Sequence, residues 1–178
     1  MRDVVLYALL SLDGVAEEPG DWMFEADHDV VENLAAVISR QDDVLLGRGT
    51  YDYWADYWPS SDVQPFADFI NQTPKHVFTS TPPARTWSRS VVVDAPLEAY
   101  VQQLKGGTGG DIGVHGSIRL ARSLLAADLV DRLELVVVPT LAGSGRRLLG
   151  DDSALRRLGL HTVARSGTGC VFLGYGRP

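Results

Sequence analysis

The chain has 178 residues, a formal net charge of −7 and a single cysteine. This length suits one domain, residues 1–178, and a single cysteine excludes an intramolecular disulfide. The acidic balance argues against a nucleic-acid partner, because phosphate backbones are bound by clustered lysine and arginine side chains.

The first half of the chain alternates apolar runs with segments of helical spacing. Residues 4–10 are almost continuously apolar, which is typical of a strand buried on both faces. The run is too short for a signal peptide or a membrane span, so we expect a cytoplasmic protein with no membrane partner. Loop-like residues follow, and then a predicted helix at 27–40, a short buried strand at 43–46 and a second helix at 63–71.

The second half continues the alternation. Strands are predicted at 76–79 and 90–93, and Pro96 begins a helix. Another strand at 112–115 enters a helix through Ser117, a plausible N-cap. The last strands are expected at 133–138, 160–165 and 171–175, and the final two read as a hairpin. The pattern predicts an α/β fold of three layers, with a mostly parallel sheet and an antiparallel C-terminal hairpin.

The end of the second predicted strand carries residues suited to an anion. It reads VLLGRGTYD, so the strand runs into Gly47. Glycine lets a backbone approach a ligand closely, and free amides at a following helix start attract anions. Arg48 adds a guanidinium and Thr50 a hydroxyl. The alternative is a glycine turn with a surface arginine.

A second junction has the same character. In IGVHGSIRLARSLL a strand enters a helix through Gly116, Ser117 and Ile118, which offer backbone amides to a phosphate. An ordinary capped helix would give the same sequence. Two such junctions in one chain favour a site that spans a pyrophosphate, because ligands of α/β sheets bind beyond the carboxyl ends of the strands.

Acidic residues follow the first strand. Asp13, in SLDG, would orient a substrate or relay a proton, although aspartate before glycine is also a common turn. Glu25, Asp27 and Asp29 are rival acids at the start of the next helix, where they would also complement the helix dipole.

Aromatic residues gather in the same part of the chain. Trp22 and Tyr51 belong to a group that would line a pocket for a flat ring, or would instead serve core packing or a dimer interface. The 4 histidines show no metal-ligand spacing, so we expect no metal.

Five motifs occur in a fixed order: SLDG, LLGRGTYD, HVFTST, GVHGSIRLARSLL and LVDRLELVVVPTLAGSGRRLLG. In this order they resemble the family that joins bacterial dihydrofolate reductases to the reductase domain of riboflavin biosynthesis. The chain is more similar to the stand-alone bacterial members of that family. The resemblance spans nearly the whole chain and implies a dihydrofolate-reductase-like fold.

The resemblance also implies a nicotinamide cofactor. In the family the G-R-x-T segment holds cofactor phosphate, which corresponds to Gly47, Arg48 and Thr50. The Gly-Gly segment that contacts the pyrophosphate reads Gly116-Ser117 here, so its second glycine is replaced.

The residues that correspond to the family's binding site for the adenosine end of the cofactor depart from the family pattern. The family's serine-arginine pair for the 2′-phosphate corresponds to Thr79 and Ser80, so the arginine is missing. Arg85 or Arg89 would have to compensate. We therefore expect NADPH, with NADH as the alternative.

On the substrate side the resemblance implies two acids. Riboflavin-type members share the SLDG aspartate, here Asp13, and authentic dihydrofolate reductases carry an acid near the position of Asp27. We expect a reductase of a small heterocyclic (pterin- or pyrimidine-like) or carbonyl substrate, working as a homodimer as such relatives commonly do. The alternatives are a non-catalytic nucleotide-binding module that has kept the fold and, more weakly, a flavin-binding protein.

Overall fold

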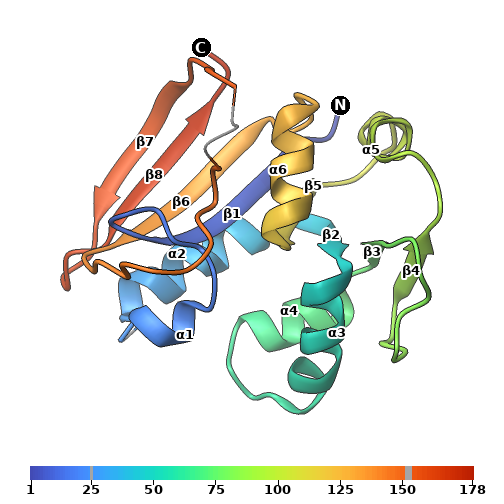
Figure 1. Cartoon of the computed structure of the whole chain (residues 1–178), viewed down its shortest axis with the longest axis horizontal. Coiled ribbons are helices and arrows are strands. Elements are labelled where there is room, and N and C mark those ends of the chain that lie inside the picture. The colour runs from blue at the N-terminus through green and yellow to red at the C-terminus, as the bar shows by residue number, and fades with distance from the viewer. Residues whose placement is uncertain (25, 151–153) are drawn as a thin grey trace.

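The computed structural model describes residues 1–24, 26–150 and 154–178, so Glu25 lies outside the described residues. Within them runs an eight-stranded sheet of order β4-β3-β2-β5-β1-β6-β8-β7 (Figure 1). The strands are β1 (Val4–Ser11), β2 (Gln41–Gly47), β3 (Lys75–Phe78), β4 (Ser90–Val93), β5 (Asp111–Gly116), β6 (Arg132–Val138), β7 (Gly159–Arg165) and β8 (Val171–Gly176). β8 is antiparallel to β6 and β7, whereas the other pairs are parallel. This arrangement confirms the predicted fold class.

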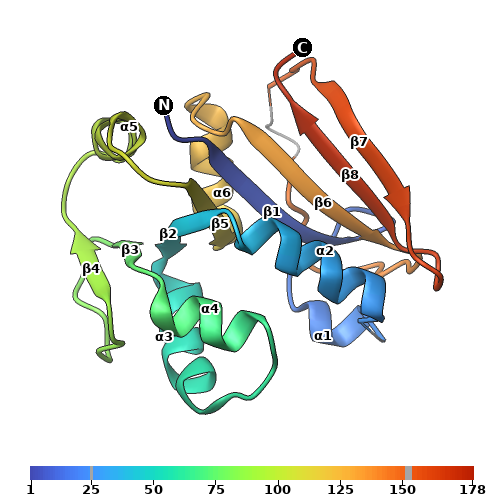
Figure 2. The ribbon, with the colours of Figure 1, turned by 180° about the vertical axis from the view of Figure 1, so that it is seen from behind.

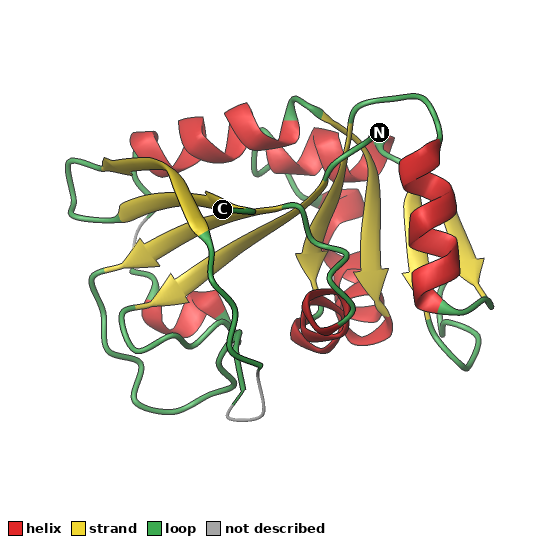
Figure 3. Cartoon of the chain, turned by 90° about the horizontal axis from the view of Figure 1, so that it is seen from above, coloured by secondary structure: helices red, strands yellow, loops and turns green. Residues whose placement is uncertain are grey.

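Helices cover both faces of the sheet, giving the three layers visible from above (Figure 3). They are α1 (Pro19–Trp22), α2 (His28–Ile38), α3 (Arg48–Tyr57), α4 (Phe66–Gln72), α5 (Leu97–Gly106) and α6 (Ile118–Ala126), with a 3₁₀ turn at Trp58–Ser60. In the described part of the chain, none of these helices is long and apolar enough to cross a bilayer.

The alternation of side chains along β1 divides the core between the two faces. Val4 and Leu6 pack with residues of α5 and α6, whereas Val5 and Tyr7 face α1 and α2. Successive side chains of a strand point to opposite faces, so an apolar run without alternation is what a sheet covered on both sides requires. Figures 1 and 2, which view the molecule from opposite sides, show α6 over one face and α2 over the other.

Two helical segments differ from the sequence prediction. Residues 19–22, expected in a loop, form α1, which is a single turn and too short to show helical periodicity. The aromatic segment after Gly47, for which the sequence predicted no helix bounds, forms α3.

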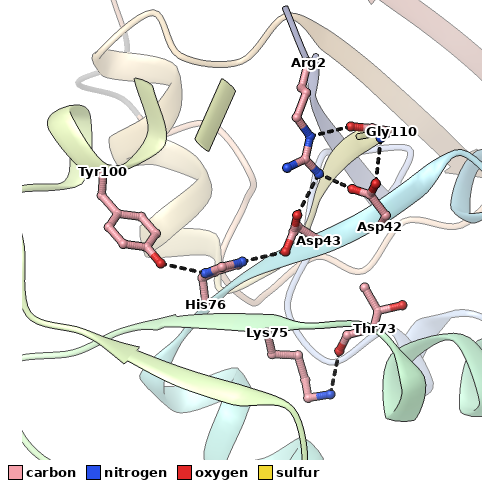
Figure 4. Close-up of polar contacts among 8 residues, drawn as sticks. All are labelled: Arg2, Asp42, Asp43, Thr73, Lys75, His76, Tyr100 and Gly110. Carbon is pink, nitrogen blue, oxygen red and sulfur yellow. Dashed lines mark hydrogen bonds and ion pairs between the residues drawn. The ribbon is translucent and has the colours of Figure 1, made fainter. Parts of the chain in front are cut away.

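A polar network at the amino ends of the strands fastens α5 to the sheet (Figure 4). Arg2 pairs with Asp42 and, at 2.7 Å, with Asp43. Asp43 Oδ1 lies 2.7 Å from His76 Nε2, and His76 Nδ1 lies 2.8 Å from the Tyr100 hydroxyl on α5. This chain of contacts fixes the position of α5, whose first turn walls the cavities described below.

Candidate functional site

The two glycine-bearing turns meet at the carboxyl ends of β2 and β5, which are neighbouring parallel strands. A Cβ atom on Gly47 would lie 2.2 Å from Ser117 Oγ, and one on Gly116 would lie 2.7 Å from Thr50 Oγ1. Gly116 also has a φ of 151°, a backbone conformation that favours glycine. The close approach of the turns therefore depends on the absence of side chains at both glycines.

Each turn leads directly into a helix. α3 follows Gly47, which has no side chain to cap it, and α6 follows Ser117, whose Oγ accepts a hydrogen bond from Leu120 N at 3.3 Å. The first amides of a helix have no partner within that helix and carry partial positive charge. Two adjacent helix starts therefore form a site suited to an anion.

A cavity of about 420 Å³ opens at these turns. Three predicted segments share its lining, which comprises Gly47, Arg48, Gly49, Phe78, Thr79, Ser80, Thr81, Leu97, Ser117, Arg119, Leu120 and Ser123. A second cavity of about 390 Å³ shares Phe78, Thr79, Ser80 and Leu97 with the first and extends past the end of β4 to Asp94. The loop after β3 thus stands between the two cavities, and together they offer room for an elongated ligand.

Two arginines line the larger cavity but differ in their surroundings. Arg48 is bound to Asp52 and to the loop after β3. Arg119 is exposed and forms no side-chain hydrogen bond or ion pair with any residue in the described ranges. Sequence reasoning missed Arg119; the only signal was a basic residue in the first turn of a helix that follows the Gly116 turn.

Arg85 and Arg89, considered as replacements for the missing arginine, line neither cavity. Arg85 forms an ion pair with Asp56 at 2.7 Å. Thr79 and Ser80 therefore line both cavities without either of these guanidinium groups.

Asp13 joins the end of β1 to the AGSG turn after β6. Its carboxylate accepts hydrogen bonds from Ser11 Oγ (2.7 Å), Ala142 N (2.9 Å) and Gly143 N (3.0 Å). These bonds, that of Ser11 above all, lower the pKa of Asp13 from 3.8 to about 2. Asp13 is therefore ionised at neutral pH, and it connects two of the motifs that carried the family resemblance. It is not among the residues that line the two cavities.

Asp27 is the N-cap of α2 and links that helix to the β7–β8 turn. Its Oδ1 accepts a hydrogen bond from Val30 N (2.9 Å), and its Oδ2 accepts one from Thr168 Oγ1 (2.5 Å). The Thr168 hydroxyl and the Val30 amide lower the pKa of Asp27 to about 2. The structural role considered for Asp27 from the sequence was complementation of the helix dipole, and these contacts show it as the N-cap of α2.

The structure does not bring Trp22 and Tyr51 into the cavities. Trp22 is 5% exposed and donates its Nε1–H to Glu17 O, while Tyr51 is 2% exposed and its hydroxyl accepts from Trp87 N. Both rings belong to core clusters beneath α1 to α4. Core packing therefore accounts for both residues. The sequence left this alternative open because aromatic rings occur both in protein cores and in ligand pockets.

Comparison with known proteins places this geometry in a family. The chain matches the model of the RibD C-terminal domain over residues 2–172. It is 29% identical over 164 residues to the protein YwjB of Bacillus subtilis (strain 168), a match that covers 89% of this chain and 90% of YwjB.

Solved structures show the same fold. A Shewanella sp. PV-4 protein, whose name refers to riboflavin biosynthesis, superposes with a TM-score of 0.81 at 18% identity over 99% of both chains. A Thermotoga maritima diaminohydroxyphosphoribosylaminopyrimidine deaminase/5-amino-6-(5-phosphoribosylamino)uracil reductase gives a TM-score of 0.72 at 16% identity, over 99% of this chain but 57% of that one. With the family model spanning nearly all of its length, the chain belongs to the RibD C-terminal domain family.

Proposed function

We propose that this protein is an NAD(P)H-dependent reductase of a small heterocyclic substrate, of the pyrimidine or pterin class, or of a small carbonyl compound. The observation that carries the proposal is the meeting of the Gly47 and Gly116 turns, each at the start of a helix. The Thermotoga neighbour, which is named as a uracil reductase, supports a pyrimidine-like substrate.

The residues at the turns fit a dinucleotide. The amides at the starts of α3 and α6 would bind the diphosphate, and the guanidinium of Arg119, which pairs with no described residue, would add a charged hydrogen-bond donor. The second cavity would receive the adenosine end beside Thr79 and Ser80. When bound, the nicotinamide supplies a hydride to the substrate.

In this proposal Asp13 helps to orient the substrate. A carboxylate whose pKa is about 2 holds no proton at neutral pH, so Asp13 does not act there as a general acid. Hydrogen bonds from Ser11, Ala142 and Gly143 hold the carboxylate, and Arg147 Nη2 lies 3.8 Å from its Oδ2. We propose that Asp13 orients the substrate indirectly, by holding the turn after β6 in place.

The same contacts favour one alternative, a non-catalytic nucleotide-binding module. Asp13 and Asp27 are both ionised and both committed to hydrogen bonds within the fold, so neither is a ready proton donor. Such a module would bind the cofactor and oxidise none of it with any substrate.

Titration with NADPH and with NADH, followed by nicotinamide fluorescence, tests the proposal. We expect saturable binding of at least one of them, and no binding at millimolar concentrations would contradict the proposal. Turnover with a panel of pyrimidines, pterins and small carbonyl compounds then separates the reductase from the non-catalytic module.

A further inference from the structure

Two nitrogens of the Arg48 guanidinium, Nη1 and Nε, are bound by other residues of the protein. Its Nη1 donates to Thr81 O (2.9 Å), Thr81 Oγ1 (2.9 Å) and Pro82 O (2.7 Å). Its Nε is paired with Asp52 Oδ2 at 2.5 Å, one turn further along α3. To bind an anion with the same nitrogens, Arg48 would have to give up contacts to two carbonyl oxygens and a carboxylate.

These contacts hold a loop that has few other attachments. The loop, residues 79–82, leaves the end of β3 and folds on itself, because Thr79 Oγ1 donates to Thr81 O (2.6 Å) and accepts from Thr81 N (3.1 Å). Ser80, Thr81 and Pro82 are exposed. Thr79 and Ser80 nevertheless wall both cavities, so the position of the loop sets the shape of the site.

Asp52 fixes the orientation of the Arg48 side chain. The pair is spaced i, i+4 on α3, and each side chain is about one-third exposed, at 30% for Arg48 and 33% for Asp52. The carboxylate also offsets the positive charge that a phosphate would otherwise meet at this point. In contrast, Arg119 reaches the same cavity with its charge uncompensated by any described residue.

We propose that Arg48 is a positioning residue: it latches the loop of residues 79–82 in the place where that loop walls the dinucleotide site, while Arg119 supplies the cation for the diphosphate. The role of Arg119 rests on the proposed function, whereas the latch is a property of the protein without cofactor. A lysine cannot replace the latch, since an ammonium group lacks the planar fork that reaches carbonyl and carboxylate acceptors together.

Hydrogen–deuterium exchange of the protein without cofactor tests the latch directly. In Arg48→Met and Arg48→Lys we expect amides in peptides spanning residues 79–89 to exchange about tenfold faster, because local opening becomes easier. Exchange in β1 should stay unchanged, which shows that the fold is intact. Arg119→Met is the matched control and should leave the loop at wild-type exchange. Wild-type exchange in both Arg48 variants would overturn the latch.

Binding of two ligands separates positioning from direct contact. Inorganic pyrophosphate would touch the helix starts but not the loop, whereas NADPH would touch both. In Arg48→Met we expect the Kd of NADPH to rise about tenfold and that of pyrophosphate to change less than about twofold, while Arg119→Met should weaken both. If Arg48→Met weakened the binding of NADPH and of pyrophosphate equally, and Arg48→Lys retained NADPH binding, Arg48 would contact the phosphate directly instead.

The variant Asp52→Asn separates a latch role of Arg48 from direct phosphate binding by Arg48, because the two roles predict different changes in NADPH affinity. As part of the latch, Asp52 should be needed for loop protection, so the variant should exchange faster at residues 79–89 and bind NADPH no more tightly. If Arg48 were a phosphate ligand, release from Asp52 would strengthen binding. Failure of the wild-type protein to bind either ligand would overturn the proposed function, and the exchange experiment would still decide on the latch.

Discussion

Gly47 and Gly116 occupy positions where a single methyl group changes the site. A Cβ on Gly47 would come within 2.2 Å of Ser117 Oγ, a separation that no packing tolerates, so Ser117 would have to move. Ser117 also caps α6 through Leu120 N, so its movement would disturb both the anion site and the start of the helix.

We therefore expect Gly47→Ala to weaken cofactor binding by about tenfold or more, since it displaces one of the two turns that would contact the diphosphate. Fluorescence titration with NADPH measures this change. Gly106→Ala is the control, because a Cβ at Gly106 meets nothing within 4 Å, and it should bind as the wild type does. Equal binding by the two variants would contradict the proposed diphosphate site.

Asp13→Asn should reduce turnover while leaving cofactor affinity close to that of the wild type. Asparagine keeps one acceptor oxygen and replaces the other with an NH₂ donor. It therefore loses one of the hydrogen bonds that Ala142 N and Gly143 N now donate to separate carboxylate oxygens, and the turn after β6 would shift. Cofactor Kd and kcat, measured on the same preparation, check this. Undiminished turnover would remove Asp13 from the substrate site.

How well single residues could be predicted depended on how distinctive their local pattern was. Gly47 and Gly116 could be predicted as positions of close backbone approach, because each stands between a buried strand and a helix. Trp22 and Tyr51 could not be assigned to a core or to a pocket, because an aromatic residue has the same sequence context in both. Arg119 was missed since a basic residue on an amphipathic helix normally reads as part of its solvated face.

Among the elements, α2 is tied to the β7–β8 turn by a charge. The folded state lowers the pKa of Asp27 from 3.8 to about 2, so it favours the ionised form. The resulting stabilisation is fully present above pH about 4 and is lost as the pH falls through about 2.

We expect Asp27→Asn to have a smaller loss of unfolding free energy than the wild type over this acid range, because the variant has no proton to take up. Urea unfolding at several pH values between about 5 and 2 measures the slope. Thr168→Val, which removes the largest contributor to the lowered pKa, should give an intermediate slope. A wild-type slope in Asp27→Asn would contradict the assignment.

The attachment of α5 makes a further prediction for an element. Tyr100→Phe removes the hydroxyl that lies 2.8 Å from His76 Nδ1 and should cost about 1 kcal/mol of unfolding free energy. Because Leu97 on the same helix lines both cavities, cofactor affinity should also fall. Tyr53→Phe is the control: its ring is 64% exposed. If Tyr100→Phe and Tyr53→Phe unfold alike, the network does not hold α5.

Element types were largely predictable because their periodicities are strong, as in the unbroken apolar run of β1 and the Ser117 cap of α6. The start of α4 was less predictable: it lies at Phe66 and not at residue 63, since local patterns leave helix ends loosely defined. The links between elements, such as Asp27 to Thr168, join positions far apart in the chain and have no local signature.

At the scale of the whole molecule, the order of the strands creates the site. β2 and β5 are neighbours in the sheet although two strands and three α-helices separate them in the chain. Alternating strands and helices predict a parallel sheet but leave several orders open, so the sequence alone supports two anion-binding turns without placing them together. The presence of two such turns nevertheless favoured one site that spans a pyrophosphate, and the contact between Gly47 and Ser117 shows that the turns are adjacent.

The molecule as a whole is acidic, with a net charge of −7, yet its proposed ligand is an anion. The two observations agree because binding is assigned to local donors, namely the amides at two helix starts and the guanidinium of Arg119. Raising the salt concentration should therefore weaken cofactor binding only modestly, since few charges take part.

A crystal structure of the protein soaked with NADPH measures the central claim most directly. The account predicts one diphosphate bound between the two turns, with its oxygens within hydrogen-bond distance of the first amides of α3 and α6. A dinucleotide bound elsewhere on the molecule, with the cavity beside Gly47 and Ser117 free of phosphate, would contradict it.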